Sequence, residues 1–376
     1  MYQSFLDFRK AKKLVAKHGS PLLVMSESRI KNNYNTLKRI LDGITVHYPL
    51  KTAGHKGILN ILRNLGAHFD VASFGEIQSL LDLGVDATKM LYSNPVRSSQ
   101  DTARAYNVGV ETFVYDNDAC LQVMSRYAAE ADVMLRVAVS NNNAYYKLST
   151  KFGCQPKDAI RLLKKAKKLG LNPMGLAFNA GSQSHGSGDY LEAIKLCKNI
   201  FKDAKKNGIQ LRALDIGGGF PARNSDRPLP QSAESIMTDV RNSLEENFPK
   251  SMEVEWIVEP GRFTVSDAGV LISRVLGKSK RNGVNWYYLD DGVAHDLTDT
   301  KFSGWDWTFQ VPRKGKKIRS VLAGPSCDSF DIISKNQWLP ELELNDIVMI
   351  PNAGAYTTGL ASTYNGFQPA EIVFID

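Results

Sequence analysis

From about residue 44 to residue 260, short apolar runs alternate with stretches whose apolar residues recur at three- and four-residue intervals. The short runs predict β-strands, and the periodic stretches predict amphipathic helices. There are eight strand candidates: VHYPLK, HFDVAS, KMLYSN, TFVYD, DVMLRVAV, MGLAFNAG, LRALDIGGG and VEWIVEP. Several helical stretches end in glycine, which commonly terminates a helix. Alternating strands and helices favour a parallel sheet, and eight repeats favour a closed (βα)₈ TIM barrel, an α/β fold.

Beyond about residue 265 the pattern changes to strand-like segments with few helical stretches between them. The segments are VLISRVLG, NWYYLDDG, KKIRSVLAG, DIVMIPNAG and AEIVFID. They predict a separate C-terminal antiparallel β-domain. The strand-like PLLVM at 21–25 precedes the barrel and is expected to join that domain. We therefore predict an N-terminal segment at 1–26, the barrel at 27–265 and the β-domain at 266–376.

Length and composition agree with this division. A chain of 376 residues is too long for one ordinary domain, and 43% hydrophobic with 23% charged residues is typical of a soluble globular protein. The N-terminus lacks the apolar core of a secretory signal, and no apolar run reaches the roughly 18 residues of a membrane helix. Four cysteines without paired spacing favour a reducing, cytoplasmic setting.

The net charge of +8 has two interpretations. Lys164, Lys165, Lys167 and Lys168 lie on the polar side of a predicted amphipathic helix, so the charge can be an ordinary solvated surface. Alternatively, the overall field attracts an anionic substrate. Nucleic-acid binding is disfavoured because no basic patch is interleaved with aromatic residues.

Polar and small residues occupy seven of the predicted strand ends. They are Lys51, Asp70, Asn94, Arg136, Asn179, Gly217 to Gly219, and Glu259. One lysine at a strand end is normally just a solvated amine. However, the active sites of (βα)₈ barrels gather at the C-terminal ends of the strands, so the whole set predicts a site there.

This set has the parts of a site for pyridoxal 5′-phosphate. The glycines of LDIGGGF leave backbone N–H groups accessible to a phosphate, although they could instead form only a sharp turn. In EPGRF, Arg262 suits the phosphate, and Glu259 suits a pyridinium nitrogen better than a surface ion pair. The amine of Lys51 could form a Schiff base with the aldehyde. No metal is expected.

The same segments resemble the ornithine, arginine and diaminopimelate decarboxylase family. The motifs are HYPLK, FDVASFGEI, LYSNP, LRV, KFG, LDIGGGF, EPGRF, GPSCDSFD, and NAGAYT with STYNGF, in the family's order and spacing. The resemblance covers roughly residues 20 to 376, and the forms CDSFD and STYNGF are similar to the eukaryotic and viral ornithine/arginine branch. It implies an alanine-racemase-like barrel and a pyridoxal-phosphate-dependent amino-acid decarboxylase.

The resemblance also implies roles for residues in matching motifs. Lys51 matches the Schiff-base lysine, and Asp70 and Glu76 match positions near it. Arg136 matches a contact to the oxygen of the cofactor ring, and Glu259 matches the partner of the pyridine nitrogen. Contacts to the phosphate are implied for Ser182, Gly218, Gly219, Arg262 and Tyr356. Gly217, Gly261 and Asn179 are also predicted to bind the cofactor.

Two further matches imply a homodimer with shared active sites. Cys327 and Asp328 in GPSCDS match residues that reach the active site from the other subunit. Without this flanking motif, Cys327 would be interpreted as a buried structural thiol.

The sequence departs from the family at Asn179. The family's Phe-His-Val-Gly-Ser motif, whose histidine stacks on the cofactor ring, reads FNAGS here. An amide can neither stack nor ionise as an imidazole does, which affects cofactor affinity and the fidelity of reprotonation. Lys51 and Glu259 preserve the central chemistry. His185, in a predicted loop nearby, is a weaker candidate to compensate.

A second departure concerns the distal end of the substrate. In DDGVAHDLTDTKFSGWDW, Ala294 replaces the family's tyrosine. An ungapped alignment places Ser303 at the aspartate that binds a distal amine, with Lys301 two residues before it. A three-residue insertion would place Asp306 there instead, but we favour Ser303. We expect a distal end that is neutral or anionic, and bulky enough to use the space opened by Ala294.

Three alternatives to such a decarboxylase follow from the same residues. One is an ordinary ornithine, lysine or arginine decarboxylase of polyamine synthesis. Another is a non-catalytic decarboxylase-like binding protein, which would need neither Lys51 nor Cys327. A racemase on the same barrel would not be expected to carry GPSCDSFD.

Among non-standard substrates, an amino-carboxypropyl group on a phosphate, as in microcin C-type peptide-nucleotide antibiotic biosynthesis, suits the charge, Ala294 and Lys301. A siderophore or other secondary-metabolite precursor is the main rival.

Overall fold

The computed structural model describes residues 4–222, 229–303 and 305–376, which form two compact units. Of the described residues, one unit contains 31–221 and 229–263, and the other contains 4–30, 222, 264–303 and 305–376. Among the described residues, no helix has the length and hydrophobicity of a membrane span.

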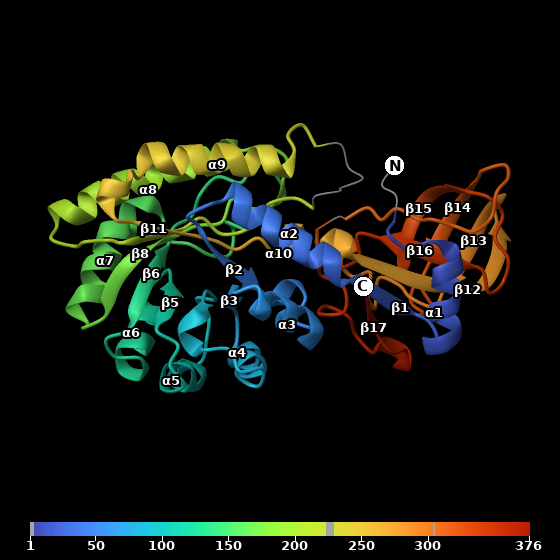
Figure 1. The fold of residues 1–376 in the computed structure, drawn as a ribbon, viewed down its shortest axis with the longest axis horizontal. Helices are drawn as coiled ribbons and strands as arrows, with labels where there is room; N and C mark the ends of the chain where they lie inside the picture. Colours follow the sequence, from blue (N-terminus) through green and yellow to red (C-terminus); the bar gives the residue numbers. More distant parts are fainter. Residues whose placement is uncertain (1–3, 223–228, 304) are drawn as a thin grey trace. The chain divides into compact units, whose positions relative to one another are not determined.

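The first unit is the predicted closed barrel (Figure 1). Parallel strands close in the order β10-β11-β2-β3-β4-β5-β6-β8. Their bounds are β2 (Thr45–Pro49), β3 (His68–Val71), β4 (Met90–Tyr92), β5 (Thr112–Tyr115), β6 (Asp132–Arg136), β8 (Asn172–Ala177), β10 (Ala213–Asp215) and β11 (Glu255–Val258). Each corresponds to one of the eight strand candidates, so the fold prediction is confirmed.

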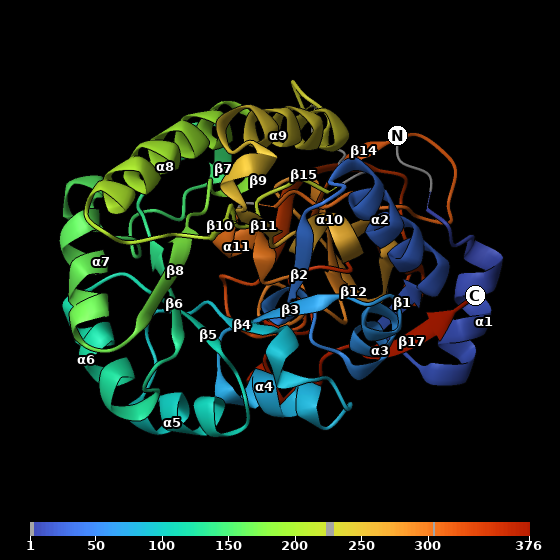
Figure 2. The ribbon, with the colours of Figure 1, turned by 60° about the vertical axis from the view of Figure 1, so that its left-hand side comes forward.

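Helices cover the outside of this barrel, and Figure 2 shows α5 to α8 as an arc around its strands. The helices are α2 (Glu27–Ile40), α3 (Lys56–Asn64), α4 (Phe74–Leu81), α5 (Ser99–Asn107), α6 (Asp118–Tyr127), α7 (Ala159–Lys168), α8 (Gly188–Lys206) and α9 (Ala233–Asn247). Side chains of Ser73, Ser98, Asn117 and Ser232 cap helix N-termini. The predicted glycine stops, Gly66, Gly84, Gly109, Gly170 and Gly208, all adopt positive φ, which glycine tolerates best.

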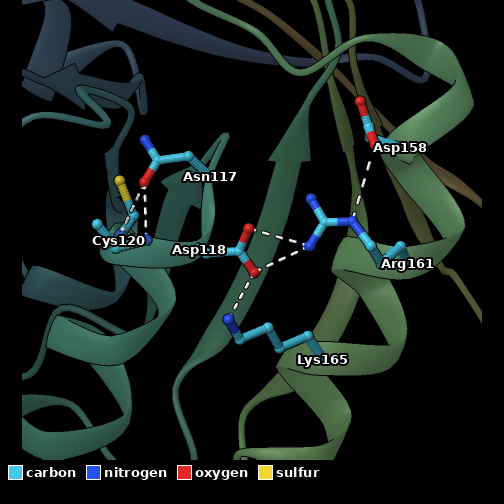
Figure 3. A network of polar contacts seen from close by, with 7 residues as sticks. Asn117, Asp118, Cys120, Asp158, Arg161 and Lys165 are labelled. Atoms are coloured by element: carbon cyan, nitrogen blue, oxygen red, sulfur yellow. Dashed lines mark hydrogen bonds and ion pairs between the residues drawn. The ribbon is translucent and has the colours of Figure 1, made fainter.

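The basic helix α7 is partly neutralised by its neighbour α6 (Figure 3). The carboxylate of Asp118 accepts hydrogen bonds from Arg161 Nη1 at 3.0 Å and from Lys165 Nζ at 2.6 Å. Arg161 Nε also lies 3.7 Å from an oxygen of Asp158. Exposed pairs of this kind contribute little to stability, because water and salt screen the charges. This part of the positive charge is therefore an ordinary solvated surface.

The interior of the barrel contains both an apolar cluster and buried carboxylates. One buried apolar cluster draws on six strands: Leu91, Val114, Met134, Met174, Ala177, Ala213 and Ile257. Asp70 pairs in register with Leu91, and Asp215 pairs with Ile257. Since residues in register share a face of the sheet, both carboxylates project into the same interior as the cluster. Asp70 and Asp215 are therefore direct neighbours of the apolar cluster inside the barrel.

The second unit is a seven-stranded sheet in the order β15-β14-β13-β12-β1-β17, with β16 paired to β12. The strands are β1 (Leu22–Ser26), β12 (Gly269–Arg281), β13 (Val284–Leu289), β14 (Ile318–Ala323), β15 (Ile332–Leu339), β16 (Ile347–Pro351) and β17 (Glu371–Ile375). The N-terminal strand β1 joins this sheet as predicted. The sheet is mixed rather than purely antiparallel, because β1 runs parallel to β17 and β13 runs parallel to β14.

Several elements were not predicted. Helix α1 (Phe8–His18) packs Ala11 and Val15 into the apolar cluster of the second unit. Strand β15 has an irregular burial pattern, so its sequence lacks the alternation that marks a strand. In the barrel unit, β7 (Ala144–Tyr146) and β9 (Ser182–Ser184) form a small antiparallel sheet. The helices α10 (Gly261–Val265) and α11 (Asp299–Phe302) are each only about one turn long.

Candidate active site

Lys51 and Asp70 form an ion pair at the ends of adjacent strands. Lys51 lies in a short 3₁₀ turn, Leu50–Thr52, directly after β2, and Asp70 lies in β3. Lys51 Nζ donates to Asp70 Oδ2 at 2.9 Å. The carboxylate is 1% exposed, whereas the lysine side chain is 45% exposed. A buried carboxylate therefore orients an amine that a ligand can still reach.

Glu76 lies beside this pair, in the first turn of α4. Its Oε2 accepts a hydrogen bond from the backbone N–H of Ala72 at 2.6 Å. Burial raises the pKa of Glu76, and the nearby charge of Asp70 raises it further, whereas Lys51 lowers it. The structure thus brings together three residues that the sequence placed near one another.

Glu259 follows β11, and its side chain is 8% exposed. Its backbone N–H donates to Gly217 O at 2.9 Å, which fixes it next to the glycine segment. Burial raises the pKa of the Glu259 carboxyl, as does Asp70, whereas Lys51 and Arg136 lower it. Glu259 therefore belongs to the same electrostatic cluster as the Lys51–Asp70 pair.

The segment Gly217–Gly219 follows β10, and its backbone packs very closely against neighbouring backbone atoms. A Cβ atom on Gly217 would lie 2.4 Å from Phe178 O, and one on Gly218 would lie 2.3 Å from Glu259 O. Among the described residues, the N–H groups of Gly218 and Gly219 donate no hydrogen bond. The segment is therefore both a tight turn and a source of free backbone donors. This donor set fits a phosphate group.

Gly219 allows a direct test of this packing. Its φ is +99°, and a Cβ atom would lie 2.1 Å from Gly181 O and 2.8 Å from the Tyr190 hydroxyl oxygen. Backbone strain and overpacking together predict that Gly219→Ala lowers the free energy of unfolding by about 2 to 6 kcal/mol. Gly208→Ala is the matched control, because its φ is +71° but the space around it is open. It should cost only about 1 kcal/mol. Equal losses in urea titrations of the two variants would contradict this account.

The other predicted cofactor residues of the barrel unit lie on several connecting segments. Arg136 ends β6, with its guanidinium carbon 5.4 Å from the centre of the Phe152 ring. Ser182 begins β9 and is half-buried. Gly261 has no room for a side chain, because a Cβ atom would lie 2.1 Å from Thr52 Oγ1 at the end of β2. Arg262 is 5% exposed.

Asn179, at the position of the family's stacking histidine, is held by its own loop. Its side-chain oxygen accepts a hydrogen bond from the backbone N–H of Gly181 at 3.0 Å. Its backbone oxygen accepts from Asn141 Nδ2, also at 3.0 Å. The amide thus shapes the turn between β8 and β9. His185 is in edge contact with Tyr145, with ring centres 5.4 Å apart.

The remaining cofactor and shared-site residues lie in the second unit. Cys327 is exposed, and both its backbone N–H and its thiol donate to Asn365 Oδ1. Asp328 Oδ1 accepts from the backbone N–H of Phe330 at 3.1 Å. Tyr356 has a φ of +56°, a left-handed conformation that is rare for tyrosine and tends to occur at functional sites. The exposure of Cys327 excludes the interpretation as a buried structural thiol, which the sequence would favour if its flanking motif were ignored.

The residues predicted for the distal pocket are also in the second unit. Ala294 is 9% exposed. Ser303 follows α11, is half-buried, and its hydroxyl donates to Asp299 O at 3.1 Å. Lys301 is exposed and forms no ion pair within the described part of the chain. Asp306 is exposed as well.

The sequence analysis missed Asp215, the last residue of β10. It is 1% exposed, and its Oδ1 accepts from the backbone N–H of Gly217 at 2.8 Å. Burial raises its pKa well above the usual value, and the nearby Glu259 adds to this effect. An acidic residue inside the apolar strand LRALDI was the available signal, because an unpaired charge is costly to bury.

Comparison with known proteins agrees with this site. Residues 27–266 match the family described as "Pyridoxal-dependent decarboxylase, pyridoxal binding domain". The lysine/ornithine decarboxylase of Selenomonas ruminantium is 34% identical over 371 residues, covering 99% of this chain and 93% of that protein. Antizyme inhibitor 2 of Xenopus laevis is 33% identical over 353 residues, covering 89% and 76%. The crystal structure of SrLDC with PLP and cadaverine has a TM-score of 0.93 at 33% identity, covering 100% and 95%.

Proposed function

The chain belongs to the pyridoxal-dependent decarboxylase family, with pyridoxal 5′-phosphate as its cofactor, and from that premise we propose that it decarboxylates an amino acid or an amino-carboxypropyl group through Lys51. The observation that carries this proposal is one constellation at the strand ends. The amine of Lys51 is held by buried Asp70, beside buried Glu259 and the N–H groups of Gly218 and Gly219, which donate to no described residue.

Each part of this constellation has a chemical task. Pyridoxal 5′-phosphate, when bound, would supply an electron-accepting ring that favours loss of the substrate carboxylate as carbon dioxide. Asp70 orients the Lys51 amine, whose half-exposed position leaves it accessible to an aldehyde. Glu259 offers its carboxylate to the pyridine nitrogen. The glycine N–H groups, with Arg262, offer donors to the phosphate.

We also propose a homodimer whose sites combine the barrel of one subunit with Cys327 and Asp328 of the other. Both residues are exposed and lie in one loop with Phe330, which is 44% exposed. The rings of Phe330 and Tyr364 lie 6.2 Å apart, and Tyr364 is 41% exposed. Aromatic residues exposed next to functional side chains are typical of protein–protein interfaces.

We further propose that the substrate's distal end carries no positive charge. In the ungapped alignment Ser303 takes the place of the amine-binding carboxylate, and its hydroxyl already donates to Asp299 O. Lys301 presents an ammonium that no described residue neutralises. A second ammonium would be repelled there, whereas a phosphorylated or otherwise anionic tail would be attracted. An amino-carboxypropyl group on a phosphate, of the microcin C type, belongs to this substrate class.

The ratio of kcat/KM for ornithine to kcat/KM for an amino acid with an anionic tail tests this substrate class. Wild type should prefer the anionic tail, and more strongly at low salt. Ser303→Asp should shift the ratio toward ornithine by roughly 10- to 100-fold, the range for a hydrogen bond to a charged group. Ser303→Asn is the matched control of similar shape without the charge, and it should leave the ratio nearly unchanged.

The second candidate is an ordinary lysine or ornithine decarboxylase, and the name of the S. ruminantium relative favours it. Wild type would then turn over ornithine or lysine at least as well as any anionic analogue, and Asp306 would become the expected amine partner. A non-catalytic role is favoured only by the likeness to antizyme inhibitor 2. The Lys51–Asp70 pair would serve no purpose in such a protein.

A cytoplasmic location remains our proposal, supported by four cysteines that form no disulfide.

A further inference from the structure

Two buried carboxyl groups meet inside the barrel, and the family resemblance accounts for only one of them. Asp215 is 1% exposed and Glu259 is 8% exposed, and they lie at the ends of the paired strands β10 and β11. Gly217 connects them, because its N–H donates to Asp215 Oδ1 at 2.8 Å and its oxygen accepts from the Glu259 N–H at 2.9 Å. Because a carboxylate can only accept, a hydrogen bond between two carboxyl groups requires a proton on one of them.

The surroundings place that proton on Asp215. Lys51 and Arg136 lie near Glu259 and favour its charged form. Asp215 forms no ion pair with any described residue, and its Oδ1 accepts a hydrogen bond from the backbone N–H of Gly217. Asp70 disfavours a charge at both positions. Burial raises the pKa of both carboxyls, and Asp215 is shifted well above its usual value.

We propose that Asp215 is a positioning residue that stays protonated and donates a hydrogen bond to Glu259, which thereby meets the pyridine nitrogen of the cofactor as a fixed, ionised carboxylate. Asp215 Oδ1 accepts the hydrogen bond from the Gly217 N–H. The proton is therefore assigned to the other oxygen, Oδ2, which donates to Glu259. The same side chain therefore links the nitrogen end of the cofactor site to the glycine segment that offers donors to the phosphate.

The test compares binding of pyridoxal 5′-phosphate to the apoprotein in Asp215→Ala and Asp215→Asn. The asparagine amide can still donate to Glu259 and accept from Gly217, whereas alanine removes both bonds. We expect Asp215→Ala to weaken cofactor binding by roughly 10- to 100-fold, as for loss of a hydrogen bond to a charged group. Asp215→Asn should stay close to wild type.

The pH dependence of binding separates this role from a merely structural one. Without its donor, Glu259 protonates at a higher pH. The affinity of Asp215→Ala relative to wild type should therefore fall as the pH is lowered. Val114→Ala, in the apolar cluster of the barrel, is the control that destabilises the barrel without changing this ratio with pH. The proposal is overturned if Asp215→Ala binds like wild type, if Asp215→Asn is as weak as Asp215→Ala, or if the ratio is independent of pH.

Infrared spectroscopy of the holoenzyme provides a test even if Asp215→Ala fails to fold. The band of a protonated carboxyl group should be present in wild type and reduced in Asp215→Asn, and an unchanged band would refute the proposal. Asp291 and Asp296 form another buried carboxyl pair, and their contribution is identified with Asp291→Asn. These experiments measure cofactor binding and protonation, so they remain valid whichever substrate the enzyme decarboxylates.

Discussion

Lys51→Ala should abolish decarboxylation and the absorbance of the lysine-bound cofactor. Without the amine, the cofactor cannot be held covalently and cannot be passed to a substrate amine. We expect a loss in kcat of roughly a thousandfold or more, measured as carbon dioxide release by the purified holoenzyme. This change also leaves the buried carboxylate of Asp70 without its ammonium partner, so folding has to be checked separately.

Two further variants make the Lys51 result interpretable. Lys51→Arg keeps a cation beside Asp70 but offers no amine able to form a Schiff base, so it should fold like wild type and be equally inactive. Lys56→Ala removes an exposed lysine from the adjacent helix α3 and should retain full activity. Substantial turnover by either Lys51 variant would rule out the assigned role.

Mixing two inactive variants should restore activity if the active sites are shared between subunits. Lys51→Ala disables the barrel side of a site, and Cys327→Ala disables the loop contributed by the other subunit. Random exchange in an equal mixture makes half of the dimers mixed, and each mixed dimer has one intact site. We therefore expect up to about a quarter of wild-type activity.

The control for complementation is a mixture of Lys51→Ala with Lys51→Arg. Both changes lie on the barrel side, so no mixed dimer contains an intact site and no activity should return. Subunit exchange has to be demonstrated with differently tagged chains. If exchange occurs and the Lys51→Ala and Cys327→Ala mixture stays inactive, each subunit carries a complete site.

The sequence predicted the barrel because its signals are local. Strand runs, helical periodicity and terminal glycines such as Gly66 depend only on neighbouring residues, and the structure has all eight strands where the runs lie. The pairing of β7 with β9 joins residues 144–146 to residues 182–184 and leaves no local pattern. The irregular burial of β15 hides it in the same way.

The candidate site was predictable only in part, for a related reason. Residues at strand ends could be found from the sequence, since a barrel brings such ends together. Asp215 was missed because its significance depends on Glu259, which follows the adjacent strand, and on the Gly217 N–H, which only the folded chain brings together. Asn179 was correctly singled out as a departure, but its bond to the Gly181 N–H is visible only in three dimensions.

Release of labelled carbon dioxide from carboxyl-labelled amino acids is the most direct test of the central proposal. The purified holoenzyme should release one carbon dioxide for each amine formed, and Lys51→Arg should release none. The test panel should include ornithine, lysine and an amino acid with a phosphorylated tail. A holoenzyme that binds pyridoxal 5′-phosphate but only racemises these substrates, or leaves all of them unchanged, would contradict the assignment as a decarboxylase.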